Sequence, residues 1–86
     1  MRDYKKRSGY EIMMDILEAS MTGANKTKIV YSAYLNFKQA KQYIEHLEEV
    51  ELLREKNSGR KKIYQTTEKG KEVLAKYKDL ESVISI

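Results

Sequence analysis

The sequence of 86 residues contains no cysteine and a single histidine, His46, and its apolar runs are short. Without cysteine the chain can form neither a disulfide framework nor a thiolate metal site. One histidine alone makes no metal site either, so we assign His46 a partly exposed structural role. A membrane-spanning helix needs about 20 mostly apolar residues in a row, and no segment approaches that length. No secretion signal precedes the first helical pattern, and we therefore expect a cytoplasmic protein.

Enzymatic patterns are missing as well. No nucleophile is paired with a base, no glycine-rich loop is built to cradle a phosphate, and no pair of acids lies on an apolar segment. There is no internal repeat, low-complexity stretch or linker, which indicates one small domain. We therefore expect a protein without catalytic activity, cofactor, metal ion, membrane contact or small-molecule ligand.

Charge is what the sequence has in abundance. Charged residues make up 35% of the chain, and the net charge is +4. The cations gather at the flanks: residues 1–28 carry six basic and four acidic side chains, residues 57–86 carry seven and four, and the segment between them carries four and five. A basic surface of this kind favours an anionic partner.

Capping residues and apolar periodicity predict four helices. Ser8 and Glu11 have the spacing of a capping box, and the apolar pattern after them predicts a helix over residues 9–20. Asn36 and Gln39 repeat that spacing before a longer apolar stripe. We expect the other helices at residues 26–33, at residues 37–50, and from Thr67 to the end of the chain.

A β-hairpin is expected between the third and the last helix. Residues 52–56 and 62–66 have the pattern of two short strands around the turn Asn57-Ser58-Gly59. The resulting order is that of a winged helix-turn-helix, a mainly α domain with a small β-hairpin wing. We divide the chain into a basic N-terminal arm, the winged domain and a C-terminal dimerisation helix, at residues 1–7, 8–66 and 67–86.

The helix expected at residues 37–50 has an unusual order of charges. Its apolar stripe consists of Phe37, Ala40, Ile44, Leu47 and Val50, while the opposite side is basic and amide-rich at the start and acidic toward the end. The helix macrodipole favours the reverse order by about 0.3–1 kcal/mol for each well-placed charge. We interpret the basic half as the part that approaches phosphates; the alternative is a solvated face whose charges fell in this order by chance.

The candidate DNA contacts follow from side-chain chemistry. Glutamine pairs with adenine, and lysine reaches guanine or phosphate, so the expected groove-facing residues are Lys38, Gln39, Lys41 and Gln42. Gln39 has an alternative role, which is to close the helix cap at Asn36. The expected backbone contacts come from the wing and the second helix: Arg60, Lys61, Lys62, Lys26 and Lys28. No acid separates the three wing cations in the sequence, and we expect no helical partner to neutralise them.

Most tyrosines are expected in the core, because they fall at inward or boundary positions of the predicted elements. These are Tyr10, Tyr31, Tyr34, Tyr43, Tyr64 and Tyr77. For Tyr43 a phosphate contact is the alternative, and for Tyr64 it is projection onto the DNA side of the wing.

The segments TGANKTKIVYSAYLNFKQAKQYIEHLEEVELLRE and KKIYQTTEKGKEVL resemble the small archaeal winged-helix DNA-binding proteins. The most specific pieces are Lys26-Thr27-Lys28-Ile29, Tyr43-Ile44 and Thr67-Glu68-Lys69-Gly70. The resemblance implies a dimeric DNA-binding protein without enzymatic activity. Some members are chromatin-associated proteins, in which a long C-terminal helix pairs antiparallel with its mate, and others are predicted transcriptional regulators.

The C-terminal helix of this chain is short for such a coiled coil, because the sequence ends at Ile86. Its apolar residues still alternate by four and three, as heptads do. We expect its first turns to pack on the domain itself, and its later apolar residues to pair across a two-fold axis: Tyr77, Leu80, Val83 and Ile84.

The leading hypothesis is therefore a homodimer that binds double-stranded DNA as a transcriptional regulator, associated with the nucleoid. An architectural chromatin protein with little sequence preference would have the same fold. A winged-helix protein-interaction module that never touches DNA is the third alternative, which the acidic end of the third helix keeps open.

Overall fold

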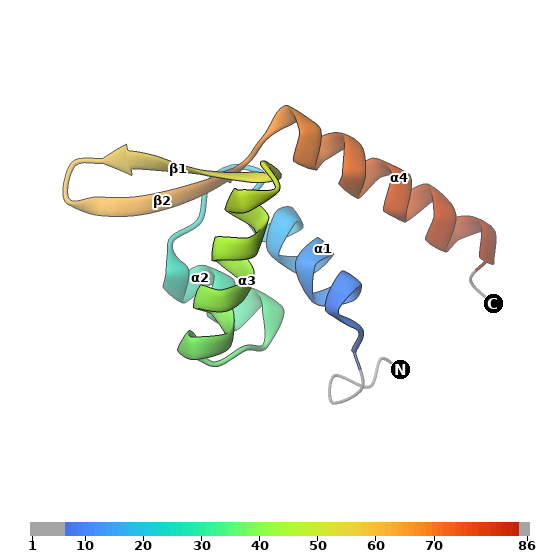
Figure 1. The fold of residues 1–86 in the computed structure, drawn as a ribbon, viewed down its shortest axis with the longest axis horizontal. Coiled ribbons are helices and arrows are strands. Elements are labelled where there is room, and N and C mark those ends of the chain that lie inside the picture. Colours follow the sequence, from blue (N-terminus) through green and yellow to red (C-terminus); the bar gives the residue numbers. More distant parts are fainter. Residues whose placement is uncertain (1–6, 85–86) are drawn as a thin grey trace.

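The computed structural model describes residues 7–84 of the chain (Figure 1). The order of elements matches the sequence prediction, and the fold is a mainly helical winged helix-turn-helix. The wing and the last helix project from the three-helix core in opposite directions (Figure 1). The elements are α1 (Gly9–Ala19), α2 (Lys26–Ala33), α3 (Phe37–Glu49), β1 (Leu53–Ser58), β2 (Lys61–Thr66) and α4 (Glu68–Ile84).

Side-chain caps fix the starts of the helices where the sequence predicted them. Ser8 and Glu11 form a capping box at α1, and the Asn25 side chain accepts a hydrogen bond from the Lys28 N–H (2.8 Å) at α2. At α4 the Thr67 hydroxyl accepts from the Gly70 N–H (3.0 Å). Each cap satisfies a backbone donor that a helix start otherwise leaves unpaired.

The wing turn is shorter than the sequence indicated. Ser58 pairs with Lys61 in an antiparallel register, so only Gly59 and Arg60 remain in the turn. The assignment of Asn57 and Ser58 to the turn was therefore wrong. Gly59 has a φ of 65°, which suits the tight turns that join hairpin strands.

The base of the wing is tied to the loop between α1 and α2. Ala24 and Tyr64 exchange two backbone hydrogen bonds, with N···O distances of 2.9 and 2.8 Å, so β2 lies between β1 and this loop. Helix α1 ends at Ala19, capped by Ser20, so the loop that follows it contains Gly23. Gly23 has a φ of 98° and lets Ile63 of β2 pack closely against it. These contacts orient the wing relative to α2.

The hydrophobic core is small, and it leaves several expected members outside. Ile16, Leu17, Ile29 and Leu47 are fully buried. The other buried apolar residues are Met14, Ala24, Ala33, Leu35, Ala40, Ile44, Leu53, Tyr64 and Leu74. The mid-helix part of the predicted α3 stripe is therefore confirmed.

The core assignment was wrong for four aromatic residues. Their exposed fractions are 71% for Tyr10, 76% for Tyr31, 63% for Tyr34 and 55% for Phe37. Phe37 is the first residue of α3, ahead of the part of the helix that crosses the core. A domain of this size has too little interior to bury so many large rings.

Arg7 was assigned to a loose N-terminal arm, yet its side chain is anchored. It forms an ion pair with Asp15 (2.6 Å), donates a hydrogen bond to the Ala33 carbonyl, and lies 5.9 Å from the centre of the Tyr34 ring. Its side chain is only 2% exposed. The remaining residues of the predicted arm, 1–6, lie outside the described residues.

The start of α4 packs closely on the domain. Gly70 is buried, and a Cβ atom there would overlap the Leu52 carbonyl oxygen and press on Thr66 Cγ2 at 2.7 Å. Leu74 is the last buried residue of the helix, and Tyr77 is partly buried against the core. The later turns are exposed and extend away from the core (Figure 1). No helix within residues 7–84 has the length and apolarity of a membrane span.

Candidate nucleic-acid interface

The exposed face of α3 carries most of the predicted groove-facing residues. Lys38, Lys41 and Gln42 are all exposed, while Ala40 and Ile44 bury the opposite side of the helix. Because the buried side holds the helix against the core, these three polar side chains are directed outward. Their hydrogen-bonding groups are free to meet a partner that lies along the first half of α3.

Gln39 is engaged in the cap of α3. Its Oε1 accepts a hydrogen bond from the Asn36 N–H (3.1 Å), and the Asn36 side chain accepts one from the Gln39 N–H (2.7 Å). Bidentate recognition of adenine needs both the oxygen and the NH₂ group of the amide. The cap uses that oxygen, so Gln42 is better placed than Gln39 for such recognition.

A basic hollow of about 360 Å³ lies between the start of α2 and strand β2. Lys26 from α2 lines it together with Lys61 and Lys62 from the wing, and the remaining lining residues are Asn25, Thr27 and Tyr64. The first turn of α2 contains no acidic residue, although the macrodipole would favour one there. Lys28, also on α2, is exposed. The structure thus brings Lys26 of α2 beside Lys61 and Lys62 of the wing, whereas Lys28 does not line this hollow.

A second hollow, of about 240 Å³, separates α3 from the wing and carries charges of both signs. We call it the wing groove. Ile44 and Tyr64 form the apolar part of the wing groove. Its charged residues are Lys26 from α2, Lys41, Glu45 and Glu48 from α3, Glu55 from β1 and Lys62 from β2. The sequence analysis did not predict the acidic wall, because Glu55 lies on β1 and the other two glutamates lie on α3.

Lys62 is paired with an acid of the neighbouring strand, which the sequence pattern did not predict. Its Nζ lies 3.3 Å from Glu55 Oε1 on the neighbouring strand. Opposite residues of an antiparallel pair share a face, and Glu55 faces Tyr64 while Lys62 faces Asn57, so the ion pair runs diagonally across one face of the hairpin. Lys61 points to the other face, since successive strand residues alternate. Lys61 and Arg60 are exposed at the tip.

The groove shifts the proton affinity of three of its members. Burial raises the pKa of the Glu48 carboxyl, and the nearby Glu55 and Glu45 carboxylates raise it further, against the lowering effect of Lys62. The hydrogen bond to Glu55 raises the pKa of Lys62, which therefore stays protonated. Burial raises the pKa of Tyr64, which belongs to the core as predicted.

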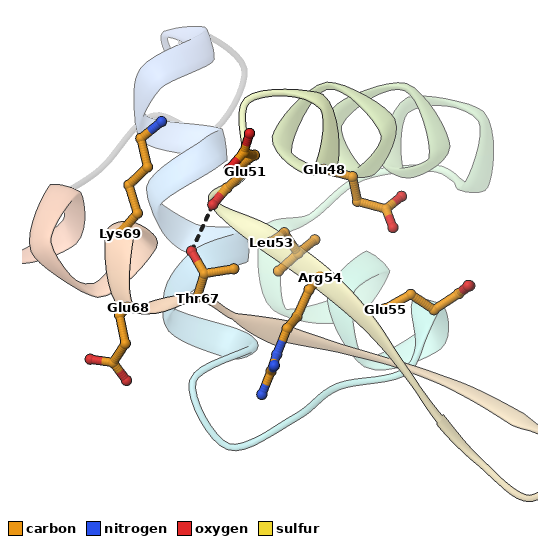
Figure 2. A pocket seen from close by; sticks show the side chains of 8 residues that line it. All are labelled: Glu48, Glu51, Leu53, Arg54, Glu55, Thr67, Glu68 and Lys69. Atoms are coloured by element: carbon orange, nitrogen blue, oxygen red, sulfur yellow. Dashed lines mark hydrogen bonds between the residues drawn. The ribbon is translucent and has the colours of Figure 1, made fainter.

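A wider hollow of about 570 Å³ lies where α3, β1 and α4 meet (Figure 2). Four carboxylates line it: Glu48, Glu51, Glu55 and Glu68. The Thr67 hydroxyl donates to the Glu51 carbonyl (2.7 Å), which is the dashed bond in Figure 2, and Lys69 Nζ donates to the Val50 carbonyl (3.2 Å). These bonds join α4 to the end of α3. Arg54 and Lys69 line the hollow as well, but the excess of carboxylates makes it less suited to phosphate than the basic hollow beside α2.

The predicted dimerisation residues divide into two kinds. Leu80, Val83 and Ile84 are 56%, 80% and 66% exposed, whereas Tyr77 is partly buried against the core of its own chain. Nearby, Lys78 forms an ion pair with Glu18 of α1 (3.0 Å), which helps to hold this part of α4 on the domain. Within residues 7–84, no three His, Asp or Glu side chains are grouped in a way that would hold a metal ion.

Comparison with known proteins decides the family. Residues 6–85 match the family model of the winged helix-turn-helix. The chain belongs to this family. The winged-helix protein is similar to Sso10a-2, a DNA-binding protein from Sulfolobus solfataricus, with a TM-score of 0.81 and 32% identity over 90% of this chain and 81% of that one. The predicted resemblance to archaeal winged-helix proteins is thereby confirmed.

Two more distant structures share the fold of this winged-helix protein. AF1382 from Archaeoglobus fulgidus has a TM-score of 0.71 and 23% identity, covering 88% of this chain and 86% of that one. BpsR from Bordetella bronchiseptica, whose DNA binding is regulated by 6-hydroxynicotinic acid, has a TM-score of 0.76 and 17% identity, covering 93% and 58%. A search of the curated proteins gave no match.

Proposed function

We propose that this winged-helix protein binds duplex DNA as a homodimer and regulates transcription. The observation that carries the proposal is the exposed basic and amide-rich first half of α3, which lies on the same domain as the basic hollow between α2 and the wing. A recognition helix in the major groove and a wing on the backbone is the docking mode that this family of folds makes possible. The similarity to Sso10a-2, a DNA-binding protein, supports the same assignment.

The proposed roles divide between base recognition and backbone contact. Gln42, Lys38 and Lys41 face the base edges. Gln39 contributes at most its NH₂ group, because its side-chain oxygen accepts the hydrogen bond of the α3 cap. The backbone contacts come from the wing and α2: Arg60, Lys61, Lys62, Lys26 and Lys28. Contacts of the second kind fix the position of the protein on the duplex and carry no sequence information.

The proposed dimer forms through the end of α4. Leu80, Val83 and Ile84 are spaced by three and four, so they lie on one side of the helix, and all three are exposed. A second copy of the helix packed antiparallel would cover them. Such a helix pair would hold two winged domains together, and both could contact one duplex. The affinity of the dimer for DNA would then exceed that of a single winged domain.

An architectural role is the second candidate. The cap on Gln39 leaves Gln42 as the exposed glutamine of α3 with its whole amide available, which weakens the case for extensive base recognition. Against it, the net charge of +4 is small for a protein that coats DNA by charge alone. Both roles place the protein on DNA in the cytoplasm, at the nucleoid, and neither involves catalysis.

Selection from a random duplex library separates these functions. A regulator enriches a sequence motif, and the enriched duplex binds more tightly than random DNA at two salt concentrations. Binding without a motif favours the architectural role. No binding at all favours a protein-interaction module.

A pair of variants tests where the duplex binds. Lys38→Gln/Lys41→Gln should weaken binding about tenfold or more, given about 1–3 kcal/mol for a good contact. Lys71→Gln/Lys76→Gln on α4 removes the same charge and is the control. Equal losses in the two variants would mean that α3 is not the contact surface.

A further inference from the structure

The wing groove contains a competitor for DNA phosphate, namely the Glu55 carboxylate. The groove is lined by three lysines and three glutamates, so a phosphate that enters it meets charges of both signs. Lys62 is the wing lysine in the groove, and its Nζ is 3.3 Å from Glu55 Oε1. The carboxylate therefore already compensates part of the positive charge that Lys62 would offer to a phosphate.

The exposure of the two side chains makes exchange possible. Lys62 is 67% exposed and Glu55 is 32% exposed, so the ammonium group remains open to solvent while the carboxylate lies deeper. A phosphate can approach Lys62 from the solvent side without any rearrangement of the hairpin. The backbone of Glu55 is held by β1 opposite Tyr64, which keeps its carboxylate within reach of Lys62.

Glu48 adds to the repulsion from α3. It lines the wing groove together with Glu55, and it is partly buried. An incoming phosphate would bring further negative charge against this pair of carboxylates. Proton uptake by Glu48 would relieve this repulsion. Burial already raises the pKa of the Glu48 carboxyl above its usual value near 4.5.

We propose that Glu55, supported by Glu48, restrains the affinity for DNA by partly neutralising Lys62 in the wing groove, so that a backbone phosphate must compete with Glu55 for the Lys62 ammonium group. This proposal rests on the proposed DNA-binding function. It makes Glu55 and Glu48 affinity-setting residues that do not themselves bind DNA. The duplex is then held mainly by the wing tip and the start of α3, and the groove contributes only when its acids are displaced or neutralised.

The test compares Glu55→Gln with Glu72→Gln, an exposed glutamate of α4 that lines neither hollow. Both variants gain one unit of net charge, so long-range attraction to DNA rises similarly. Binding to a fluorescent random-sequence duplex is measured by anisotropy at several salt concentrations. Glu55→Gln should bind DNA about two- to fivefold more tightly than Glu72→Gln, because that factor corresponds to the energy of an exposed ion pair. The slope of log K against log salt concentration should be steeper by up to about one.

A double-mutant cycle with Lys62→Gln isolates the pair. In the wild-type background this substitution should reduce the affinity for DNA only slightly, because Lys62 is already paired with Glu55. In the Glu55→Gln background the same substitution should cause a larger loss, since Lys62 is then free for phosphate. Thermal unfolding of each variant verifies that the fold is retained. A smaller loss in the Glu55→Gln background would mean that Glu55 positions Lys62 for DNA, which overturns the proposal.

The pH dependence tests the contribution of Glu48. Lowering the pH from neutral toward the usual carboxyl range should tighten DNA binding more in the wild type than in Glu48→Gln. The pKa of Glu48 is raised by burial, so this carboxyl takes up its proton at a higher pH than an ordinary exposed carboxyl, and neutral Glu48 no longer repels phosphate. The charged and titratable groups around Glu48 are the same in both proteins. On the groove side they are Glu45, Lys41, Glu55, Lys62, Tyr64 and Lys26, and on the junction side Glu51, Arg54, Glu68 and Lys69.

The outcomes separate this proposal from the proposed function. If the wild type binds duplex DNA and Glu55→Gln binds no more tightly than Glu72→Gln, the competition proposal is wrong and the DNA-binding function stands. Identical pH profiles for the wild type and Glu48→Gln would remove Glu48 from it. Absence of duplex binding by the wild type and by Glu55→Gln would overturn the function and this proposal together.

Discussion

Truncating Leu80 to alanine should weaken the proposed dimer by an amount that follows from its exposure. Leu80 is 56% exposed on the single chain, so pairing can still remove about half of its surface from water. Full burial of a leucine side chain is worth about 1.5–3 kcal/mol, which leaves about 1 kcal/mol for each protomer. A symmetric dimer contains the residue twice, and about 2 kcal/mol corresponds to a roughly 30-fold higher Kd for the dimer.

Sedimentation equilibrium over a concentration series measures this change directly. Ser82→Ala is the control, because Ser82 is exposed on α4 but lies on the far side from Leu80 at 100° per residue. The wild-type dimer itself should be weak, since few apolar side chains are available to offset an association cost of at least 4 kcal/mol. A wild type that stays monomeric at about millimolar concentration, or equal dimer constants for Leu80→Ala and Ser82→Ala, would refute the proposed α4 interface.

Two further predictions address the fold and the wing. Gly70→Ala should lower the free energy of unfolding, measured by thermal melts, by about 1–3 kcal/mol. Alanine has the better helix propensity, but the new methyl group overlaps the Leu52 carbonyl. Gly9→Ala is the control and should be close to neutral, because a Cβ there lies 3.6 Å from the Tyr43 hydroxyl. Arg60→Gln/Lys61→Gln should weaken DNA binding by a similar factor for every duplex sequence and reduce the salt slope by about two, and a change in the preferred motif would contradict the backbone role of the wing.

The helix starts could be predicted because each depends on residues close together in the sequence. Asn36 and Gln39 are three residues apart, and the structure contains both hydrogen bonds that this spacing predicts. The wing turn could not be predicted in the same way. Asn57 and Ser58 favour turns locally, yet cross-strand pairing continues through both of them.

The register of the hairpin is the source of the missed Glu55–Lys62 pair. Because Ser58 pairs with Lys61, Glu55 lies opposite Tyr64 and on the same face as Lys62. A change of one residue in the turn would place Glu55 opposite Ile63 instead, and every side chain of that strand would then change face relative to its partner. The sequence contains both charged residues, but only the exact turn length determines whether they meet.

The exposed aromatic residues were missed for a different reason. Periodicity ranks positions on a helix by direction, but it does not say how far the core extends along that helix. Phe37 lies at the start of α3, ahead of Ala40, which is the first buried residue of that helix. The amount of interior is a property of the whole domain and cannot be obtained from one helix.

The order of charges on α3 acquires a physical meaning from the wing groove. The early residues Lys38 and Lys41 are exposed, whereas Glu48 is turned into the groove, where Glu55 and the wing face it. A stability argument alone would place acids at the start of the helix and bases at its end. In the proposed complex with DNA, the reverse order would let the first half of α3 attract phosphates and the second half repel them from the groove. A duplex is then favoured across the wing tip and the start of α3, and its position along the helix is set by repulsion as much as by attraction.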